Sequence, residues 1–395
     1  MMKYIDQLDL QGKRVLIRVD FNVPLNEDRQ VTDDTRIRAA LSTIQYAMDR
    51  TARVILMSHL GRPKGTVKPE FSLKPAAEHL SRILGKDVRF APDCIGPEVE
   101  KMAAEMKPGD VLMLENLRFH PEEEKNNPDF ARKLASVADV YINDAFATAH
   151  RAHASNVAIL AFVPLCGAGF LLKSEVESFR KTMGNPERPL VALMGGAKVS
   201  GKLDALENII KKVDKVIVGG GMAFTFLKAK GFEVGKSLVE PDLIETARNI
   251  MAAAREHAVD FLLPIDCVVA EKIDPAAEIS IVPVEKIPAD KMGLDIGPET
   301  RKIFSDALKG AKTIVWNGPM GVFETEPFSK GTEATVRAVA DSPAFSFVGG
   351  GDTDTAVHLW NAADKMSYIS TAGGAFLEML EGKKLPALEA LEQGA

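Results

Sequence analysis

The feature that most constrains the fold is a pattern that recurs along the whole chain: a short apolar run, a glycine-rich or polar turn, and a stretch with helical periodicity. Strands buried on both faces of a parallel sheet have nearly continuous apolar sequences. Strands that alternate with helices predict parallel sheets with helices on both faces. We therefore expect an α/β fold. Examples of the apolar runs are residues 14–20, 53–59, 110–119, 139–146, 190–198, 215–224, 313–320 and 345–352.

The length and composition of the chain narrow the class of protein. The chain has 395 residues, more than one ordinary hydrophobic core supports, so two domains are expected. Hydrophobic residues make up 46% and charged residues 26%, which are globular values. The net charge of −6 argues against a general role at nucleic acids or membrane surfaces. The N-terminus lacks the apolar segment of a signal peptide, and no apolar run is long enough to span a membrane, so a cytoplasmic location is expected.

The three cysteines point to the same compartment. Cys94, Cys166 and Cys267 are odd in number, far apart and without CxxC spacing. We expect buried thiols in a reducing cytosol, not a disulfide framework or a zinc site.

A predicted helix near the middle of the chain marks a domain boundary. Residues 171–183 carry an apolar stripe with helical spacing, and a glycine and a proline follow, as they do at helix ends. The stripe consists of Leu172, Val176, Phe179 and Met183. We interpret this segment as a connecting helix between one domain at residues 1–170 and another at 184–382. The alternative is an ordinary helix within one large sheet, but the chemistry of the strand ends changes at this helix.

The strand ends of the first half carry mostly cationic and polar side chains. Ligands of open α/β sheets bind at the carboxyl ends of strands. Arginine and histidine gathered there suit a small, multiply charged anion, because guanidinium groups bind carboxylate and phosphate bidentately. Any single arginine is better explained by a surface ion pair, but the whole set is not. The side chains are Asp20, Asn22, His59, Arg62, Arg118, His150, Arg151 and His153.

Two further features of this half are less direct. Arg36 lies in the first turn of a predicted helix, where a cation opposes the helix dipole and therefore suggests a functional reason. The apolar face of that helix consists of Ile37, Leu41, Ile44 and Met48. His150 and His153 are also compatible with a metal pair at i, i+3, although no third ligand is obvious nearby.

The strand ends of the second half present glycines instead. In residues 345–359 an apolar strand, three glycines, Asp352 and Thr353 precede a predicted helix. Backbone amides at such a helix start bind phosphate, and Asp352 is a hard oxygen ligand of the kind that Mg²⁺ takes. Taken alone, the three glycines are equally compatible with a tight turn. Further glycine turns lie at residues 195–196, 219–221, 317–321 and 373–374.

The sequence of residues 196–203, GAKVSGKL, nearly matches the P-loop motif. Leu203 stands where the hydroxyl that binds Mg²⁺ belongs, so we reject a P-loop, but Lys198 and Lys202 are still placed to meet phosphates. Glu324 either accepts hydrogen bonds from a ribose or is a solvated acid after a turn.

An anion site in one domain and a nucleotide site in the other predict phosphoryl transfer, with domain closure to exclude water. A non-catalytic binding protein that closes on a phosphorylated acid explains the arginines but not Lys198 or Asp352. A nicotinamide-dependent dehydrogenase explains the sheets, but no dinucleotide fingerprint follows the early strands.

These motifs together resemble the phosphoglycerate kinase family over essentially the whole chain. They occur in the family's order: RVDFNVP, SHLGRP, ENLRF, NDAFATAHRAH, LMGGAKVSGKL, GGGMAFTFL, MGLDIGPE, WNGPMGVFE, GGGDT and STAGGAFLE. The resemblance implies transfer between ATP and 3-phosphoglycerate, giving ADP and 1,3-bisphosphoglycerate, with Mg²⁺. It also implies a monomeric, cytosolic glycolytic enzyme of two Rossmann-like domains with a hinge, in which the tail at 383–395 packs on the first domain.

The resemblance also implies roles for single residues. Arg36 and Lys198 are expected to stabilise the transferred phosphoryl group, His150 and His153 to belong to a supporting basic patch, and Asp352 to hold Mg²⁺. The expected phosphoglycerate site consists of Asp20, Phe21, Asn22, Arg36, His59, Leu60, Gly61, Arg62, Arg118 and Arg151. The expected nucleotide contacts are Lys198, Lys202, Gly293, Asn317, Glu324, Gly350, Gly351, Asp352 and Thr353.

One position departs from the family pattern. The family commonly has three glycines after Ser-Thr near the C-terminus, and here Ala372 replaces the first. If this position requires a positive φ, alanine costs on the order of 1 kcal/mol. We expect activity to survive, because Gly373 and Gly374 still offer their amides.

Overall fold

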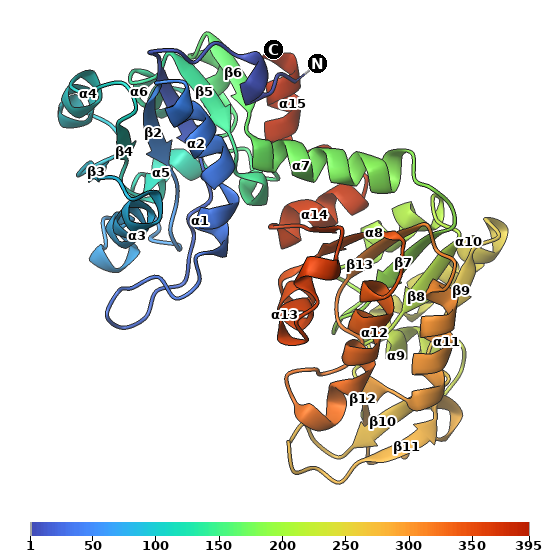
Figure 1. Cartoon of the computed structure of the whole chain (residues 1–395). Coiled ribbons are helices and arrows are strands. Elements are labelled where there is room, and N and C mark those ends of the chain that lie inside the picture. Colours follow the sequence, from blue (N-terminus) through green and yellow to red (C-terminus); the bar gives the residue numbers. More distant parts are fainter. Residues whose placement is uncertain (1, 395) are drawn as a thin grey trace. The chain divides into compact units, whose positions relative to one another are not determined.

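The computed structural model describes residues 2–394, which form two compact units. Unit 1 comprises residues 2–176 and 384–394, and unit 2 comprises residues 177–383 (Figure 1). The boundary between them falls within helix α7 (Phe170–Phe179), which continues as a π-helical segment at Arg180–Gly184. None of the helices in the described part is long and apolar enough to cross a membrane.

Unit 1 is built on a parallel sheet of six strands in the order β3-β4-β2-β1-β5-β6. The central strand β1 pairs with β2 and β5, so that Val15 lies beside Val54 and Val140. All three valines are buried, as the continuous apolar runs predict. The strands are β1 (Arg14–Arg18), β2 (Arg53–Met57), β3 (Val88–Phe90), β4 (Val111–Met113), β5 (Val140–Asn143) and β6 (Leu165–Ala168).

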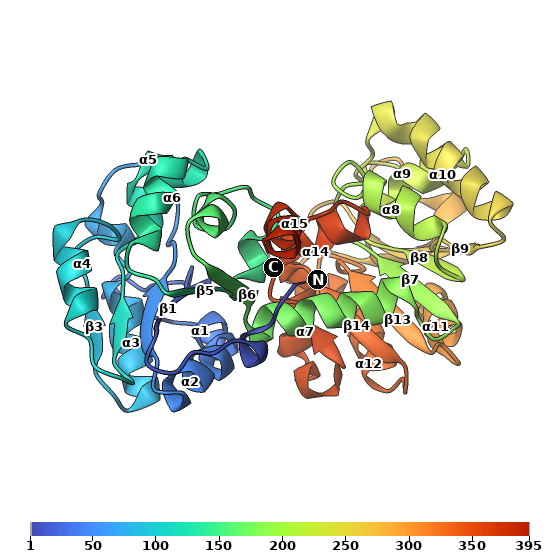
Figure 2. The same cartoon turned by 90° about the horizontal axis from the view of Figure 1, so that it is seen from above.

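Helices flank this sheet, and five of them carry proline in the first turn. Proline is tolerated there because the N–H groups of the first turn have no acceptor within the helix. The last helix lies beside β6 in both views (Figures 1 and 2), and the Ala387 N–H donates to the Ala149 carbonyl at 3.2 Å. In addition to α7, the helices are α1 (Thr35–Ala39), α2 (Leu41–Asp49), α3 (Lys74–Leu84), α4 (Pro97–Ala104), α5 (Pro121–Glu124), α6 (Pro128–Ala135) and α15 (Pro386–Gln393).

The helix predicted from Ile37 to Met48 is wrong in one respect. The structure contains two helices, α1 and α2, which meet at Ala40. The Ala40 N–H donates to the carbonyl of Ile37, three residues back, and the regular spacing resumes at Ile44. Ile37 and Ile44 are buried and Leu41 and Met48 pack beside them, so the predicted face is confirmed although the helix is interrupted.

Unit 2 contains a second parallel sheet of six strands, in the order β15-β14-β13-β7-β8-β9, which confirms the predicted α/β class. Its strands are β7 (Leu190–Met194), β8 (Lys215–Val218), β9 (Asp260–Leu262), β13 (Thr313–Asn317), β14 (Phe345–Gly349) and β15 (Tyr368–Ile369). An antiparallel sheet of three strands, which the sequence pattern did not predict, has the order β11-β10-β12. It consists of β10 (Asp266–Ala270), β11 (Ser280–Pro283) and β12 (Met292–Ile296).

The two faces of the large sheet of unit 2 belong to separate cores. Leu190 and Ala192 pack with α8, α9, α10 and α14, whereas Val191 and Leu193 pack with α11, α12 and α13. Figure 2 shows α8 to α10 on one side of the sheet and α11 and α12 on the other. The helices are α8 (Leu203–Ile210), α9 (Met222–Ala229), α10 (Ile244–Glu256), α11 (Pro298–Leu308), α12 (Lys330–Ala340), α13 (Gly351–Leu359) and α14 (Gly373–Leu380).

Two smaller expectations concern the cysteines and Ala372. Cys94, Cys166 and Cys267 are buried free thiols, as expected. Ala372 has φ −133° and ψ 110°, an extended conformation that any residue adopts, so the methyl group at this position causes no backbone strain.

Candidate functional site

The loops after β1 and β2 meet at the carboxyl edge of the sheet of unit 1. Arg36, from α1, forms an ion pair with the buried carboxylate of Asp20. His59 Nδ1 lies 3.7 Å from Asp20 Oδ1, and the Asn22 side-chain oxygen accepts the Gly61 N–H at 2.8 Å. These contacts join three separate segments of the chain into one cluster.

Arg118 joins the same cluster from the segment after β4. Its Nη1 donates to the Gly61 carbonyl at 2.9 Å, and its Nε lies 3.3 Å from Glu124 Oε1. The buried Asn116 positions this segment, because its side-chain oxygen accepts the Arg118 N–H at 3.0 Å and its amide donates to the Leu60 carbonyl at 2.7 Å.

The other predicted residues of this site are placed differently. Arg62 is exposed, and Arg151 Nε lies 3.2 Å from His150 Nε2. The side chains of Phe21 and Leu60 are buried in the core of unit 1, so only their backbone groups are available to a ligand.

The electrostatics of this cluster indicate an excess of positive charge. Burial lowers the pKa of His59 well below its ordinary value, and the charges of Arg18, Arg118 and Arg36 lower it further. Burial also lowers the pKa of His153 to about 3, with Arg118 and Arg18 adding to the shift. The pKa of Arg118 itself is lowered, mainly by burial. Burial and, to a smaller extent, the neighbouring cations therefore disfavour the charged forms of these groups, and a bound anion would favour them.

A buried network behind this cluster was not foreseen from the sequence. Arg18, the last residue of β1, is only 1% exposed, and its Nε donates to Ser155 Oγ at 3.0 Å. The Ser155 hydroxyl donates to Glu123 Oε1 at 2.6 Å, and Arg18 Nη2 lies 3.4 Å from His59 Nδ1. An arginine at the end of an apolar strand is a sequence feature that indicates a functional role. Glu123 gives no such indication, because it is one of three consecutive glutamates, a pattern typical of a solvent-exposed surface.

In unit 2 the turn between β14 and α13 has the predicted form. Gly350 has φ +101°, a conformation that L side chains rarely adopt, and α13 begins at Gly351. The Gly318 N–H donates to Thr353 Oγ1 at 2.7 Å, and the Asn317 amide donates to the Gly349 carbonyl at 2.8 Å. The ends of β13 and β14 are therefore held together beneath the N-terminus of α13.

The two lysines of the GAKVSGKL segment have different environments. Lys202 Nζ donates to the carbonyls of Gly195 at 2.6 Å and Asn317 at 3.0 Å. Burial lowers its pKa to about 8, against the opposing charge of Asp352. Lys198 is exposed on a loop that Glu240 holds by accepting the Val199 N–H at 2.6 Å. Lys202 thus connects the ends of β7 and β13 by hydrogen bonds. Lys198 is exposed to solvent and accessible to a ligand.

A cavity of about 510 Å³ lies beside these turns in unit 2. Apolar side chains form one part of its wall, including Leu238, Ile273 and Leu294, and Glu324 and Asp352 form part of the rest. Gly293 also lines it. A largely apolar cavity with a few polar groups beside a glycine turn is typical of a nucleotide site. Both carboxylates are exposed, so their oxygens are accessible to a ligand.

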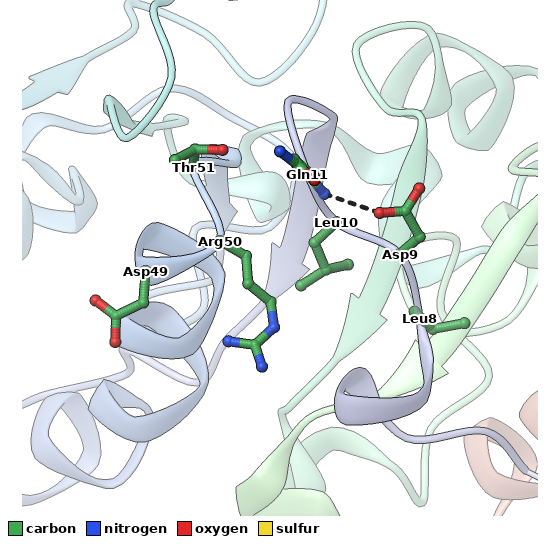
Figure 3. Close-up of a pocket in the computed structure, with 7 residues that line it drawn as sticks. All are labelled: Leu8, Asp9, Leu10, Gln11, Asp49, Arg50 and Thr51. Carbon is green, nitrogen blue, oxygen red and sulfur yellow. Dashed lines mark hydrogen bonds between the residues drawn. The ribbon is translucent and has the colours of Figure 1, made fainter.

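Another cavity, of about 350 Å³, lies in unit 1 among residues that precede β1 and β2 (Figure 3). The hydrogen bond drawn there runs from the Gln11 N–H to Asp9 Oδ1 at 3.2 Å. These residues are at the amino ends of parallel strands, opposite the edge at which α/β sheets bind ligands. None of the predicted site residues lines this cavity.

His150 and His153 do not form part of a metal cluster within residues 2–394. His153 Nδ1 lies 3.8 Å from Glu123 Oε1, and His150 contacts Arg151. The one cluster in this range whose ligand atoms are close enough for a metal ion consists of Asp93, Cys94 and His120.

Together, the cationic strand ends of unit 1 and the glycine turns and cavity of unit 2 define a class of α/β proteins that bind phosphorylated ligands at strand ends. Comparison with known proteins makes this more specific. The model of the family described as phosphoglycerate kinase matches residues 5–383. Phosphoglycerate kinase of Geotalea uraniireducens is 61% identical over 392 residues, covering 99% of this chain and 98% of that protein. The enzyme of Geobacter metallireducens is 59% identical and covers 99% of both.

Solved structures agree with this assignment. Phosphoglycerate kinase from Coxiella burnetii has a TM-score of 0.92 and 45% identity, covering 100% of this chain and 99% of that one. Phosphoglycerate kinase from Pyrococcus horikoshii has a TM-score of 0.85 and 33% identity, with the same coverage. The chain belongs to the phosphoglycerate kinase family. It is a kinase of glycolysis, and its nucleotide substrates are ATP and ADP.

Proposed function

We propose that unit 1 binds 3-phosphoglycerate, that unit 2 binds ATP with Mg²⁺, and that the enzyme transfers the γ-phosphoryl group to the carboxylate of phosphoglycerate. The products are ADP and 1,3-bisphosphoglycerate, and the reaction is reversible. The observation that carries the proposal is the clustering of Arg36, His59 and Arg118 at the strand ends of unit 1, a cationic surface suited to a ligand with a phosphate and a carboxylate.

In unit 1, Arg62, Arg118 and Arg151 bind the anionic groups of the substrate, because guanidinium matches phosphate and carboxylate geometry. Asp20 and Asn22 orient a hydroxyl group, and both are already fixed by contacts with Arg36 and Gly61. The pKa of His59 is lowered, so it is neutral at pH 7 and acts as a hydrogen-bonding group. Phe21, Leu60 and Gly61 contribute backbone groups only.

In unit 2, the amides of Gly350 and Gly351 and the N-terminus of α13 bind phosphate oxygens. Gly293 and Glu324 contact the nucleoside in the cavity, while Lys202, Asn317 and Thr353 keep the strand ends in place. Asp352 suits Mg²⁺, because it is an exposed, hard oxygen ligand beside the phosphate position, and Mg²⁺ uses one or two carboxylates together with phosphates. When bound, Mg²⁺ neutralises phosphate charge.

Arg36 and Lys198 are the catalytic side chains. Both are cations that stabilise the charge of the phosphoryl group during transfer, and such electrostatic stabilisation usually contributes more to catalysis than any other effect. The attacking carboxylate is already ionised at pH 7, so the reaction needs no general base. Direct attack also means that no side chain becomes phosphorylated.

The chain acts as a monomer in the cytoplasm. These two assignments rest on the family resemblance, and the three buried free thiols are compatible with a reducing compartment.

A coupled assay tests the proposal. We expect consumption of 3-phosphoglycerate that depends on both ATP and Mg²⁺, with no product when any of the three is left out. Turnover without 3-phosphoglycerate, or no turnover when both ligands bind, would contradict it.

A further inference from the structure

Three side chains with metal-binding chemistry meet in unit 1, away from the arginines described above. Asp93 and Cys94 follow β3, and His120 immediately precedes α5. One ligand atom from each, a carboxylate oxygen, the thiol sulfur and an imidazole nitrogen, lies within 4.8 Å of the other two. The segments are distant in sequence, and the fold brings them together because β3 and β4 are neighbours.

The cluster is well fixed in place. His120 Nε2 lies 2.7 Å from Asp93 Oδ1, and Asp93 Oδ1 also accepts the Cys94 N–H at 2.6 Å. The His120 ring packs on Phe130 with a centroid distance of 5.2 Å. A site in which the ligands are already positioned loses little conformational freedom when an ion binds.

A catalytic thiol does not explain this arrangement. Burial raises the pKa of Cys94 well above its ordinary value, whereas a nucleophilic cysteine requires a lowered pKa. His120 contacts the carboxylate of Asp93, and no hydrogen bond between His120 and the Cys94 sulfur is present in the described structure.

The charge around these three side chains differs in sign from that around Arg18, Arg36 and Arg118. Asp93 raises the pKa of His120 by its hydrogen bond and its charge, and Glu122 adds to the shift, while Lys133 acts in the opposite sense. Around Cys94, the charges of Asp93 and Glu123 also favour the protonated thiol. Carboxylates therefore dominate, and such surroundings favour a cation.

We propose that Asp93, Cys94 and His120 form a binding site for a divalent transition-metal ion of the Zn²⁺ type. Carboxylate, thiolate and imidazole are the ligand types that zinc takes in proteins, and water can complete the tetrahedron. The side chain of Asp93 is 45% exposed and that of His120 is 26% exposed, so an ion has access from solvent although Cys94 is buried.

Binding replaces protons. The Cys94 S–H proton leaves to solvent. If His120 is protonated on both ring nitrogens, its Nε2 proton leaves as well; if it is neutral, the remaining ring proton lies on Nδ1, so that Nε2 is free to bind. The thiolate sulfur, the neutral imidazole Nε2 and the carboxylate each donate an electron pair to the ion. No oxidation or reduction occurs. Affinity must therefore fall as the pH is lowered.

Cobalt(II) provides a probe that reports on sulfur ligation. The metal-stripped full-length chain is titrated with Co²⁺, and the thiolate-to-cobalt charge-transfer absorption is followed. We expect saturation at one ion per chain, loss of the absorption on addition of Zn²⁺, and a rise in the thermal midpoint with Zn²⁺. Absence of a thiolate–cobalt absorption would overturn the proposal.

Matched variants locate the site. Cys94→Ala should abolish the absorption, and His120→Asn should weaken Co²⁺ binding by about tenfold or more. Cys166→Ala removes another buried thiol, and His79→Gln removes a histidine that also contacts a carboxylate, at 2.9 Å from Asp34; both should leave the absorption unchanged. If Cys94→Ala does not fold, His120→Asn alone decides. Persistence of the absorption in Cys94→Ala, an unchanged Co²⁺ affinity in His120→Asn, or loss of the absorption in either control would refute the assignment.

Discussion

Two cations carry most of the proposed chemistry at the scale of single residues. Removal of either guanidinium or ammonium leaves phosphoryl charge unneutralised in the transition state, so Arg36→Ala and Lys198→Ala should each lower kcat by roughly 10²-fold or more. Steady-state kinetics at saturating substrates measure this directly. Arg50→Ala and Lys302→Ala are matched controls, because Arg50 stacks on Tyr46 and Lys302 pairs with Asp306. Near-normal kcat in Arg36→Ala or Lys198→Ala would refute the assigned roles.

Asp144 should make stability depend on pH. It is fully buried in unit 1, and burial raises its pKa to about 7, against hydrogen bonds from Thr43 and the Leu172 N–H. Because the folded state holds this proton more tightly than the unfolded state, its contribution is complete below about pH 4 and is lost as the pH rises to about 7. The slope for one such group reaches about 1.4 kcal/mol per pH unit.

Urea denaturation across this range tests the prediction. In Asp144→Asn the decline of the unfolding free energy should be shallower than in the parent chain. Asp139→Asn is the opposing control, since the hydrogen bond from Arg14 lowers the pKa of Asp139 and its contribution rises with pH. An unchanged slope in Asp144→Asn would show that Asp144 titrates normally.

At the scale of elements, the turn between β14 and α13 offers a matched pair of glycines. Gly350 has φ +101°, and a Cβ there would approach Asn317 Nδ2, whereas a Cβ on Gly351 would meet nothing. Gly350→Ala should therefore lower the unfolding free energy of unit 2 by about 1–2 kcal/mol, and Gly351→Ala should not. Thermal unfolding distinguishes them, and equal stability of the two variants would contradict the turn geometry.

Ala372 gives the opposite kind of prediction. Its φ of −133° requires no glycine, so Ala372→Gly relieves no strain, removes a buried methyl group and increases the freedom of the unfolded chain. We expect a loss of about 0.5–1 kcal/mol in the unfolding free energy, measured by urea denaturation. A more stable glycine variant would mean that the alanine is strained after all.

What the sequence predicted at this scale was local. The β14–α13 turn follows from consecutive residues, and the sheets follow from apolar runs. The interruption at Ala40 depends on which carbonyl accepts the Ala40 N–H. The apolar periodicity of the sequence continues through Ala40, so it does not reveal the interruption. The antiparallel sheet was not predicted, because its strand β11 is short and alternates between half-buried and exposed residues. No continuous apolar run in the sequence therefore marks β11.

The parts of the site that the sequence missed depend on long-range placement. Arg18, Glu123 and Ser155 become a network only when β1, helix α5 and a distant loop are brought together. The same holds for Asp93, Cys94 and His120, whose spacing in sequence contains no metal motif. Residues that follow strands were easier to foresee, because parallel strands end at one edge; the structure accordingly brings Asp20, Asn22, His59 and Arg118 together.

At the scale of the whole molecule, each unit has one proposed ligand. Unit 1 supplies cationic side chains and unit 2 supplies backbone amides and an apolar cavity. This division predicts that a substitution in one unit changes the affinity for one ligand alone when the ligands are measured separately.

Calorimetric titration of each ligand into the parent chain, Arg118→Ala and Gly350→Ala tests this claim most directly. We predict that Arg118→Ala loses affinity for 3-phosphoglycerate and binds ATP as the parent does, and that Gly350→Ala shows the reverse. Loss of ATP affinity in Arg118→Ala, or of 3-phosphoglycerate affinity in Gly350→Ala, would contradict the assignment of one ligand to each unit.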